Sequence, residues 1–260
     1  MRDISNDLGD GLDGKDPVHR AQVHSKRQLP ARFYEKAGVA EEADGFTVQL
    51  DGRPIRSPAK NLLTLPTRPL AELIAAEWDA QSAHIDPMTM PVIRLINTAI
   101  DGIVHDPQAV KEDILRFAGT DLLCYRADSP ETLVRRQSEA WDPIVEWAHA
   151  ALGARFVLSE GVVHVEQQRE AIAALSAHLI PHTDPIALAC LHSFTTLTGS
   201  ALLALAIANG EIDAETAWKA AHIDEDWNAG QWGEDAEASA RRAHRWSDMQ
   251  AADRAFKALS

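Results

Sequence analysis

Six carboxylates lie between Asp224 and Glu237, and no lysine or arginine lies among them. Trp227 and Trp232 are interleaved with these acids, and His222 comes just before them. Carboxylates with imidazole can bind a metal ion or transfer protons, and carboxylates beside tryptophan can also form a surface that another protein binds. The sequence therefore raises three possibilities here: a metal site, an acid/base active site or a protein-binding surface.

Two histidines elsewhere have a spacing typical of metal ligands. His178 and His182 are four residues apart, which in a helix would place both imidazoles on one face. Pro181 lies between them and would disturb that turn, and no acid lies between them as in a zinc protease. Cys190 and His192 add further ligand types nearby. We interpret these side chains as separate core or surface residues, and we expect no metal and no cofactor.

Glu225 has an unusual position if the chain forms one helix through this stretch. In such a helix four residues share a face at spacings of three and four: Trp218, Ala221, Glu225 and Asn228. A carboxylate that continues a face used for packing is either partly desolvated or meets a positive partner. We therefore expect Glu225 to be the acid on which function depends most.

The acids further along have a local reason to exist. We expect the last helix to begin at Glu234, which places Glu234, Asp235 and Glu237 in its first turn. The helix dipole stabilises carboxylates there by about 0.3–1 kcal/mol each. Glu237 can also pair with Arg241 one turn on. Glu234 is therefore the second choice for a functional acid.

A metal- or carboxylate-dependent hydrolase is the alternative function. Glycoside hydrolysis needs two carboxyl groups about 5–9.5 Å apart across a cleft. Asp224, Glu225 and Asp226 are consecutive, so they point in three directions around a helix. We therefore predict no catalytic residue, and the hydrolase remains the second interpretation.

Composition narrows the classes of protein. The chain has 260 residues, of which 45% are hydrophobic, so it can bury a sizeable core. Its net charge of -14 argues against broad nucleic-acid binding and against docking on anionic lipid. Neither a GxGxxG motif nor a phosphate loop is present. Cys124 and Cys190 lie in apolar stretches and are expected to be buried free thiols.

The elements that must position the acids follow from periodicity. We expect an acidic disordered tail at residues 1–28, without the features of a signal or mitochondrial transit peptide. A β-rich domain with one or two helices is expected at 29–106. Its first strand alternates apolar residues at 46, 48 and 50, and Asp51-Gly52 is typical of a two-residue hairpin turn. Return and third strands are expected at 53–57 and 61–66.

A helix should follow this sheet. Thr67 is a suitable N-cap with Pro69 in the first turn, and Asp86-Pro87 should stop the helix. Trp78 shares a face with Leu70 and Ile74, so we predict a structural role for it, as for the Asp51-Gly52 turn. Another helix is expected from Pro91.

Residues 107–260 are expected to form a helical domain that contains a short β-hairpin near 154–165, turning at Glu160-Gly161. The segment 186–208 carries no charge, but its hydroxyl side chains and histidine favour one buried helix over a membrane span. A helix from 213 to 230 and a final helix from Glu234 complete the domain. The predicted class is α+β, with a small β-rich N-terminal domain and a larger helical C-terminal domain.

Seven motifs occur in a characteristic order with compatible spacing from about Arg32 to near the C-terminus. They are VQLDGRPIRSP, LAELIAAEWDAQ, IDPMTMPVIRLINTAIDGI, TDLLCYRA, WDPIVEW, LTGSALLALAIANGEI and AAHIDEDWNAGQWGEDAE. Each motif alone is weak, but the ordered set is specific. The chain resembles the assembly chaperones that bind the alpha subunit of the F(1) sector of ATP synthase (F(1) assembly factor 2 family).

The resemblance implies an ATP-independent, non-enzymatic chaperone that holds the unassembled alpha subunit until the F(1) hexamer forms. It implies a protein-binding role for the acidic–aromatic motif, whose important glutamate matches Glu225. We therefore assign partner binding to Asp224, Glu225, Asp226, Trp227, Trp232 and Glu234. Eukaryotic members are mitochondrial, whereas this chain resembles a bacterial, cytoplasmic member. We expect a monomer when free, without stable membrane insertion.

Overall fold

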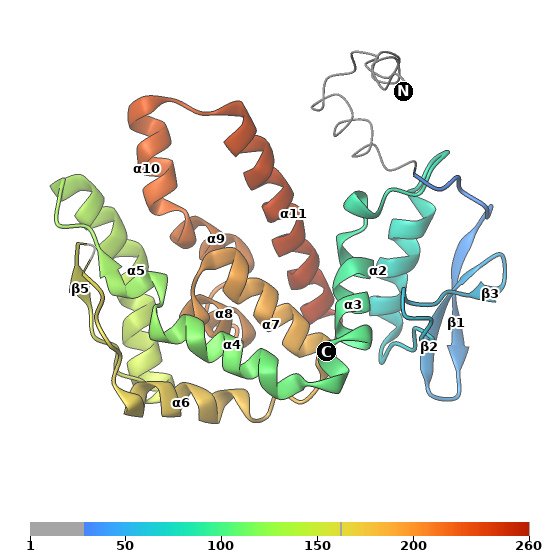
Figure 1. Cartoon of the computed structure of the whole chain (residues 1–260), viewed down its shortest axis with the longest axis horizontal. Helices are drawn as coiled ribbons and strands as arrows, with labels where there is room; N and C mark the ends of the chain where they lie inside the picture. Colours follow the sequence, from blue (N-terminus) through green and yellow to red (C-terminus); the bar gives the residue numbers. More distant parts are fainter. Residues whose placement is uncertain (1–28, 162, 260) are drawn as a thin grey trace, which may run out of the picture.

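The structure is a computed structural model that describes residues 29–161 and 163–259. The tail predicted at residues 1–28 lies outside the described residues. Figure 1 shows strands β1–β3 and helix α2 at one end of the molecule and a larger helical part at the other. Helix α3 lies between the two parts and packs against α7 and α11. This arrangement confirms the predicted α+β class, while the predicted domain boundary at 106/107 stays a prediction.

The sheet is antiparallel in the order β1–β2–β3. Asp51 and Gly52 form the predicted turn, with φ values of 48° and 78°, and they pair Leu50 with Arg53. The Asp51 carboxylate also accepts hydrogen bonds from the N–H groups of Glu35 and Lys36. The strands are β1 (Ala37–Glu42), β2 (Gly45–Leu50) and β3 (Arg53–Pro54).

Three details of the sheet differ from prediction. The return strand ends at Pro54 instead of continuing to residue 57, and the expected third strand at 61–66 is reduced to isolated bridges. Proline has no N–H group for a ladder, which limits regular pairing there. Strand β1 was not predicted, because its sequence AGVAEE contains little of the apolar alternation that marks a strand.

Helix α2 (Arg68–Asp79) begins as predicted, with Thr67 accepting a hydrogen bond from the N–H of Leu70. It ends seven residues before Asp86, the residue expected to stop it. The carbonyl oxygens of Asp79 and Gln81 accept hydrogen bonds from the Arg32 guanidinium. These bonds replace helical ones, so the helix ends at Asp79. Asp86 instead caps the short helix η1 (Pro87–Thr89).

The next helices follow the predicted periodicity, and the elements are α3 (Pro91–Asp101), η2 (Ile103–His105), α4 (Pro107–Gly119), η3 (Leu122–Cys124), α5 (Glu131–Leu152) and α6 (Arg169–Leu179).

The prediction of a hairpin near 154–165 is wrong for the described residues. Strand β5 (Ser159–Glu160) pairs in parallel with β4 (Tyr125–Arg126), which lies more than thirty residues earlier. Short-range periodicity cannot reveal such a distant partner.

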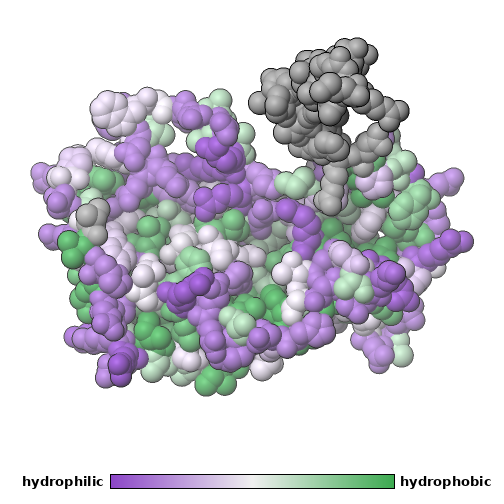
Figure 2. Space-filling view, viewed as in Figure 1, coloured by the Kyte–Doolittle hydropathy of each residue, from purple (hydrophilic) through white to green (hydrophobic). Residues whose placement is uncertain are grey.

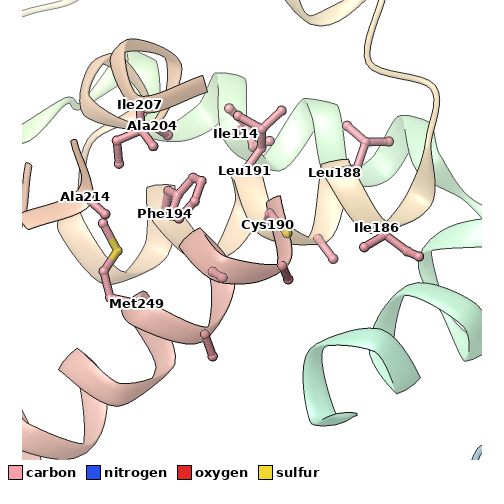
Figure 3. Close-up of a cluster of buried hydrophobic side chains, with 14 of the residues drawn as sticks. Ile114, Ile186, Leu188, Cys190, Leu191, Phe194, Ala204, Ile207, Ala214 and Met249 are labelled. Carbon is pink, nitrogen blue, oxygen red and sulfur yellow. The ribbon is translucent and has the colours of Figure 1, made fainter. Parts of the chain in front are cut away.

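The uncharged segment forms two helices, α7 (Pro185–Thr198) and α8 (Ala201–Ala208), instead of the single helix predicted. Gly199 adopts a left-handed conformation at the break. Asp121 explains the restart, because its fully buried carboxylate accepts a hydrogen bond from the N–H of Leu202. Figure 3 shows Leu191 and Phe194 of α7 in the core between α4, α8 and α11. No described helix is both long and apolar enough to cross a membrane.

The last predicted helices also differ in their ends. The helix expected at 213–230 is broken at His222 into α9 (Ala214–Ala221) and α10 (Ile223–Trp232). The final helix α11 spans Ala236–Lys257 instead of starting at Glu234. The Asp235 carboxylate accepts hydrogen bonds from the next N–H groups, so it caps α11 and leaves Glu234 in the connecting loop.

Candidate functional site

A groove of about 980 Å³ lies between α10 and α11. Figure 1 shows that α10 rises from α9, that a short loop at the upper left joins it to α11, and that α11 then runs down toward α3. Trp218 and Trp246 lie at the base of the groove, and Trp232 lies in its outer part. Figure 2 shows mainly hydrophilic side chains over this end of the molecule. The groove therefore combines an aromatic base with charged walls.

His222 holds the base of the groove together. Its side chain is buried and packs on Trp218 with 3.9 Å between ring centroids. Nδ1 lies 2.7 Å from the carbonyl oxygen of Trp218, so this nitrogen donates to that oxygen. Burial lowers the pKa of His222, an effect opposed by its hydrogen bond to Trp218 and by the nearby Glu225. The ring is therefore neutral at pH 7.

Glu225 does not lie on a continuous stripe with Trp218, because the helix is broken at His222. Its side chain is 60% exposed, so the first of the two alternatives, partial desolvation, is not found. Nε2 of His222 lies 3.5 Å from its carboxylate, and this ring is neutral at pH 7. Glu225 forms no salt bridge with a lysine or arginine of the described residues, but it lies near enough to Arg242 to raise the pKa of that guanidinium.

Asp226 points elsewhere and forms an ion pair with Arg242 of α11. This pair joins the two walls of the groove, and it raises the pKa of Arg242. Asp224 faces α5, where it accepts a hydrogen bond of 2.7 Å from Nε2 of Gln137. The three consecutive acids thus have three different surroundings, as their spacing predicted.

Trp227 also faces α5, with the guanidinium of Arg136 5.2 Å from the ring centroid. Trp232, by contrast, is 87% exposed, the most exposed large hydrophobic side chain described. Glu234 follows it in the loop, and among the described residues its one hydrogen bond is a long one of 3.5 Å from the Ser239 hydroxyl. Glu225 and Glu234 form no salt bridge with a lysine or arginine of the described residues, although both lie near enough to Arg242 to raise the pKa of its guanidinium. They line the same groove as an exposed tryptophan.

The six residues predicted for partner binding thus separate into two groups. Asp224 and Trp227 attach α10 to α5, whereas four line the groove: Glu225, Asp226, Trp232 and Glu234. Sequence reasoning missed the basic wall on α11, which consists of Arg241, Arg242 and Arg245. The spacing of these arginines at three and four residues was the available signal for it.

The other candidate residues do not converge on a site. His178 lies in α6 and His182 lies after its end, while His192 contacts Asp113 at 2.8 Å. Cys190 is buried, which raises the pKa of its thiol. Within residues 29–161 and 163–259, no cluster of three or more histidines, cysteines and acids is suitable for a metal ion.

A groove lined by an exposed tryptophan and three arginines contains the residue types that most often anchor one protein on another, so the site is that of a protein-binding protein. Comparison with known proteins identifies the family, because the model of the ATP12 chaperone protein matches residues 31–149. The solved structure of Atp12 from Paracoccus denitrificans is 42% identical, with a TM-score of 0.82, and the match covers 89% of this chain and 99% of that one. The chain therefore belongs to the ATP12 chaperone family, which confirms the resemblance seen in its motifs.

Two further relatives agree with this. The Atu1473 protein of Agrobacterium tumefaciens is 56% identical, with a TM-score of 0.86, and the match covers 98% of this chain and 96% of that one. A Schizosaccharomyces pombe protein named Protein atp12, mitochondrial is 26% identical over 217 residues. That match covers 78% of this chain and 73% of the fungal protein.

Proposed function

We propose that this protein is a chaperone for assembly of the F(1) sector of ATP synthase. In this proposal it binds the unassembled alpha subunit through the α10–α11 groove, and binding needs no ATP. Membership of the ATP12 chaperone family supports the class of function. The observation that favours the groove is Trp232, an exposed aromatic side chain in a groove that also holds two carboxylates without a salt bridge to lysine or arginine among the described residues.

The groove has the physical properties that recognition of an unfinished subunit requires. An exposed tryptophan supplies a large apolar contact area, and such residues often dominate binding energy. Glu225 and Glu234 accelerate encounter with a basic surface and fix its register, because neither carboxylate is held in a salt bridge to a lysine or arginine of the described residues. The Asp226–Arg242 pair holds the walls in position without using either of these carboxylates.

Capture of the alpha subunit tests the proposal. Tagged full-length chain is mixed with freshly unfolded-and-diluted alpha subunit, with and without ATP, and the retained subunit is quantified. Trp232→Ala should lower retention at least about fivefold, because it removes the most exposed aromatic side chain of the groove. Ile180→Ala is the matched control, since Ile180 is also an exposed apolar residue but lies outside the groove.

Equal retention by Trp232→Ala and Ile180→Ala would reject the groove as the binding site. No retention by the wild type would reject the alpha subunit as the client. A strict requirement for ATP would reject ATP independence.

We further propose that the free protein is a monomer that acts in the bacterial cytoplasm. The two bacterial relatives of known structure support a bacterial setting. Sedimentation of the free chain and fractionation of cells test the two statements separately. Among the described residues no group of three or more histidines, cysteines and acids is placed to hold a metal ion, so nothing there favours the metal-dependent form of the hydrolase that the sequence left as the alternative.

A further inference from the structure

A second groove, separate from the α10–α11 groove, lies on the N-terminal sheet. It has a volume of about 560 Å³ and is lined by the segment before β1, the β2–β3 hairpin and Trp78 of α2. Its floor is apolar, because Leu50 and Ile55 lie there with little exposure. Phe33 stands at its edge with 73% of its surface exposed, so a large aromatic side chain is available without a covering residue.

The aromatic residues of this groove form one connected array. The ring of Phe33 meets the ring of Tyr34 edge-on at 5.4 Å, and Tyr34 meets Trp78 edge-on at 5.6 Å. The Tyr34 hydroxyl donates to the carbonyl oxygen of Trp78, which fixes the array relative to α2. The Phe33 side chain is thus supported from below by Tyr34 while its outer surface faces solvent.

The charge of the groove is opposite to that of the molecule. The whole chain carries -14, yet the lining contains two exposed arginines, Arg53 and Arg56, and one carboxylate, Asp51. The oxygen atoms of Asp51 already accept hydrogen bonds from the N–H groups of Glu35 and Lys36. In the part of the chain that the structure describes, neither arginine forms a salt bridge. Arg56 donates one hydrogen bond to the carbonyl oxygen of Lys60, and Arg53 lies near enough to Asp51 to lower the pKa of that carboxyl. The other N–H groups of both exposed guanidinium groups are available to an anionic partner.

The strand edge in this groove is poorly suited to pairing with another strand. Pro54 has no N–H group to donate, and Arg56 already forms a bridge with Leu62. A partner must therefore be held mainly by its side chains. Apolar area on the floor and guanidinium groups on the wall fit an apolar side chain with a carboxylate beside it.

We propose that this groove binds an extended segment of a partner protein in which an aromatic or aliphatic side chain is flanked by carboxylates. The apolar side chain lies against Phe33 and the Leu50–Ile55 floor, and the carboxylates pair with Arg53 and Arg56. Charge complementarity selects this occupant over a basic segment. The net charge of -14 opposes the approach of a nucleic acid, whose phosphates would otherwise fit the arginines.

Peptide titration of the full-length ¹⁵N-labelled chain tests the proposal. The probe is acetyl-Gly-Glu-Phe-Glu-Gly-amide, and the readouts are the indole signal of Trp78 and the amide signals of Phe33 and Arg56. Saturable shifts are expected with this peptide. The peptides with lysine in place of glutamate, or alanine in place of phenylalanine, should give shifts at least about fivefold weaker at the same concentration.

Two variants locate the binding. Arg53→Glu with Arg56→Glu should weaken binding about tenfold or more, because it reverses both charges. Arg135→Glu with Arg169→Glu makes the same change in net charge on exposed residues outside the groove and should retain the wild-type affinity. Phe33→Ala should lower the affinity without shifting the melting temperature, since Phe33 is mostly exposed.

Several outcomes would overturn the proposal. They are equal binding of the glutamate and lysine peptides, equal weakening by both arginine pairs, and displacement of the peptide by oligothymidylate. A concentration-dependent dimer that Phe33→Ala dissociates would assign the groove to a second copy of the chain instead.

Discussion

Glu225 is the acidic residue whose charge we expect to matter for binding the client and not for stability. Its carboxylate forms no salt bridge with a lysine or arginine of the described residues, and its contact with His222 contributes little while the ring is neutral. Replacing Glu225 with glutamine should therefore leave the melting temperature nearly unchanged. If Glu225 steers the client, capture by the wild type should weaken with salt more than capture by the variant. Unfolding of Glu225→Gln, or full assembly activity, would remove Glu225 from the binding surface.

The contact between His222 and Glu225 predicts that wild type and Glu225→Gln lose different amounts of stability as the pH falls. The folded-state pKa of His222 is lowered, so the unfolded state binds a proton first as the pH falls below about 6.5, and stability decreases. Glu225 opposes this lowering. Loss of its charge should lower the His222 pKa further and increase the stability lost between pH 7 and 5. Urea unfolding of wild type and Glu225→Gln at both pH values measures this, and a smaller loss in the variant contradicts it.

Trp78 differs from Trp232 in what surrounds it. Trp78 is half-buried against Tyr34, and its indole nitrogen is buried without a partner among the described residues. Trp78→Arg should place a charge against this packing and cost about 3 kcal/mol. Trp232→Arg is the matched control, because its side chain is 87% exposed and the same change should have little effect. Thermal melts of both variants decide, and equal melting temperatures would show that Trp78 is not structural.

At the level of elements, the sequence predicts where helices start better than where they break. The start of α2 at Thr67 and Pro69 follows from local capping chemistry, which needs no knowledge of the rest of the chain. The break at Gly199 depends on Asp121, a buried carboxylate from a distant segment, whose pKa burial raises to about 6. At the break at His222, Nδ1 of the ring occupies the carbonyl oxygen of Trp218, and the backbone N–H of His222 donates to the carbonyl oxygen of Lys219 instead. Periodicity is similar on both sides of each break, so it could not reveal them.

The attachment of α10 to α5 gives a prediction at the same scale. Asp224 accepts a hydrogen bond from the buried Gln137, and this is one of few contacts that hold α10. Asp224→Ala should speed hydrogen exchange of the α10 amides about tenfold, because loss of this bond costs about 1.4 kcal/mol or more. Exchange in α7 should be unchanged. Glu42→Ala, on an exposed strand end, is the control, and equal exchange in both variants would contradict the prediction.

At the level of the whole molecule, the α+β class and the alternation of the first hairpin follow from the sequence, because they depend on composition and period. The pairing of β4 with β5 and the groove between α10 and α11 depend on contacts between distant segments. The acidic wall of the groove was predicted from its carboxylates and tryptophans. Its basic wall was missed, because only the fold places the arginines of α11 opposite those acids.

Residues 231–241 all have exposed side chains, so this segment should be sensitive to limited proteolysis. A loop and first helical turns without buried side chains open locally more easily than the core, and proteases cut segments that open. Within the described residues, trypsin should therefore nick the free protein first near Arg241 and Arg242. A client lying in the groove should delay this cut, and mass spectrometry of timed digests with and without alpha subunit follows it. An equally fast cut in the complex would mean that the client leaves the α10–α11 loop and the start of α11 uncovered.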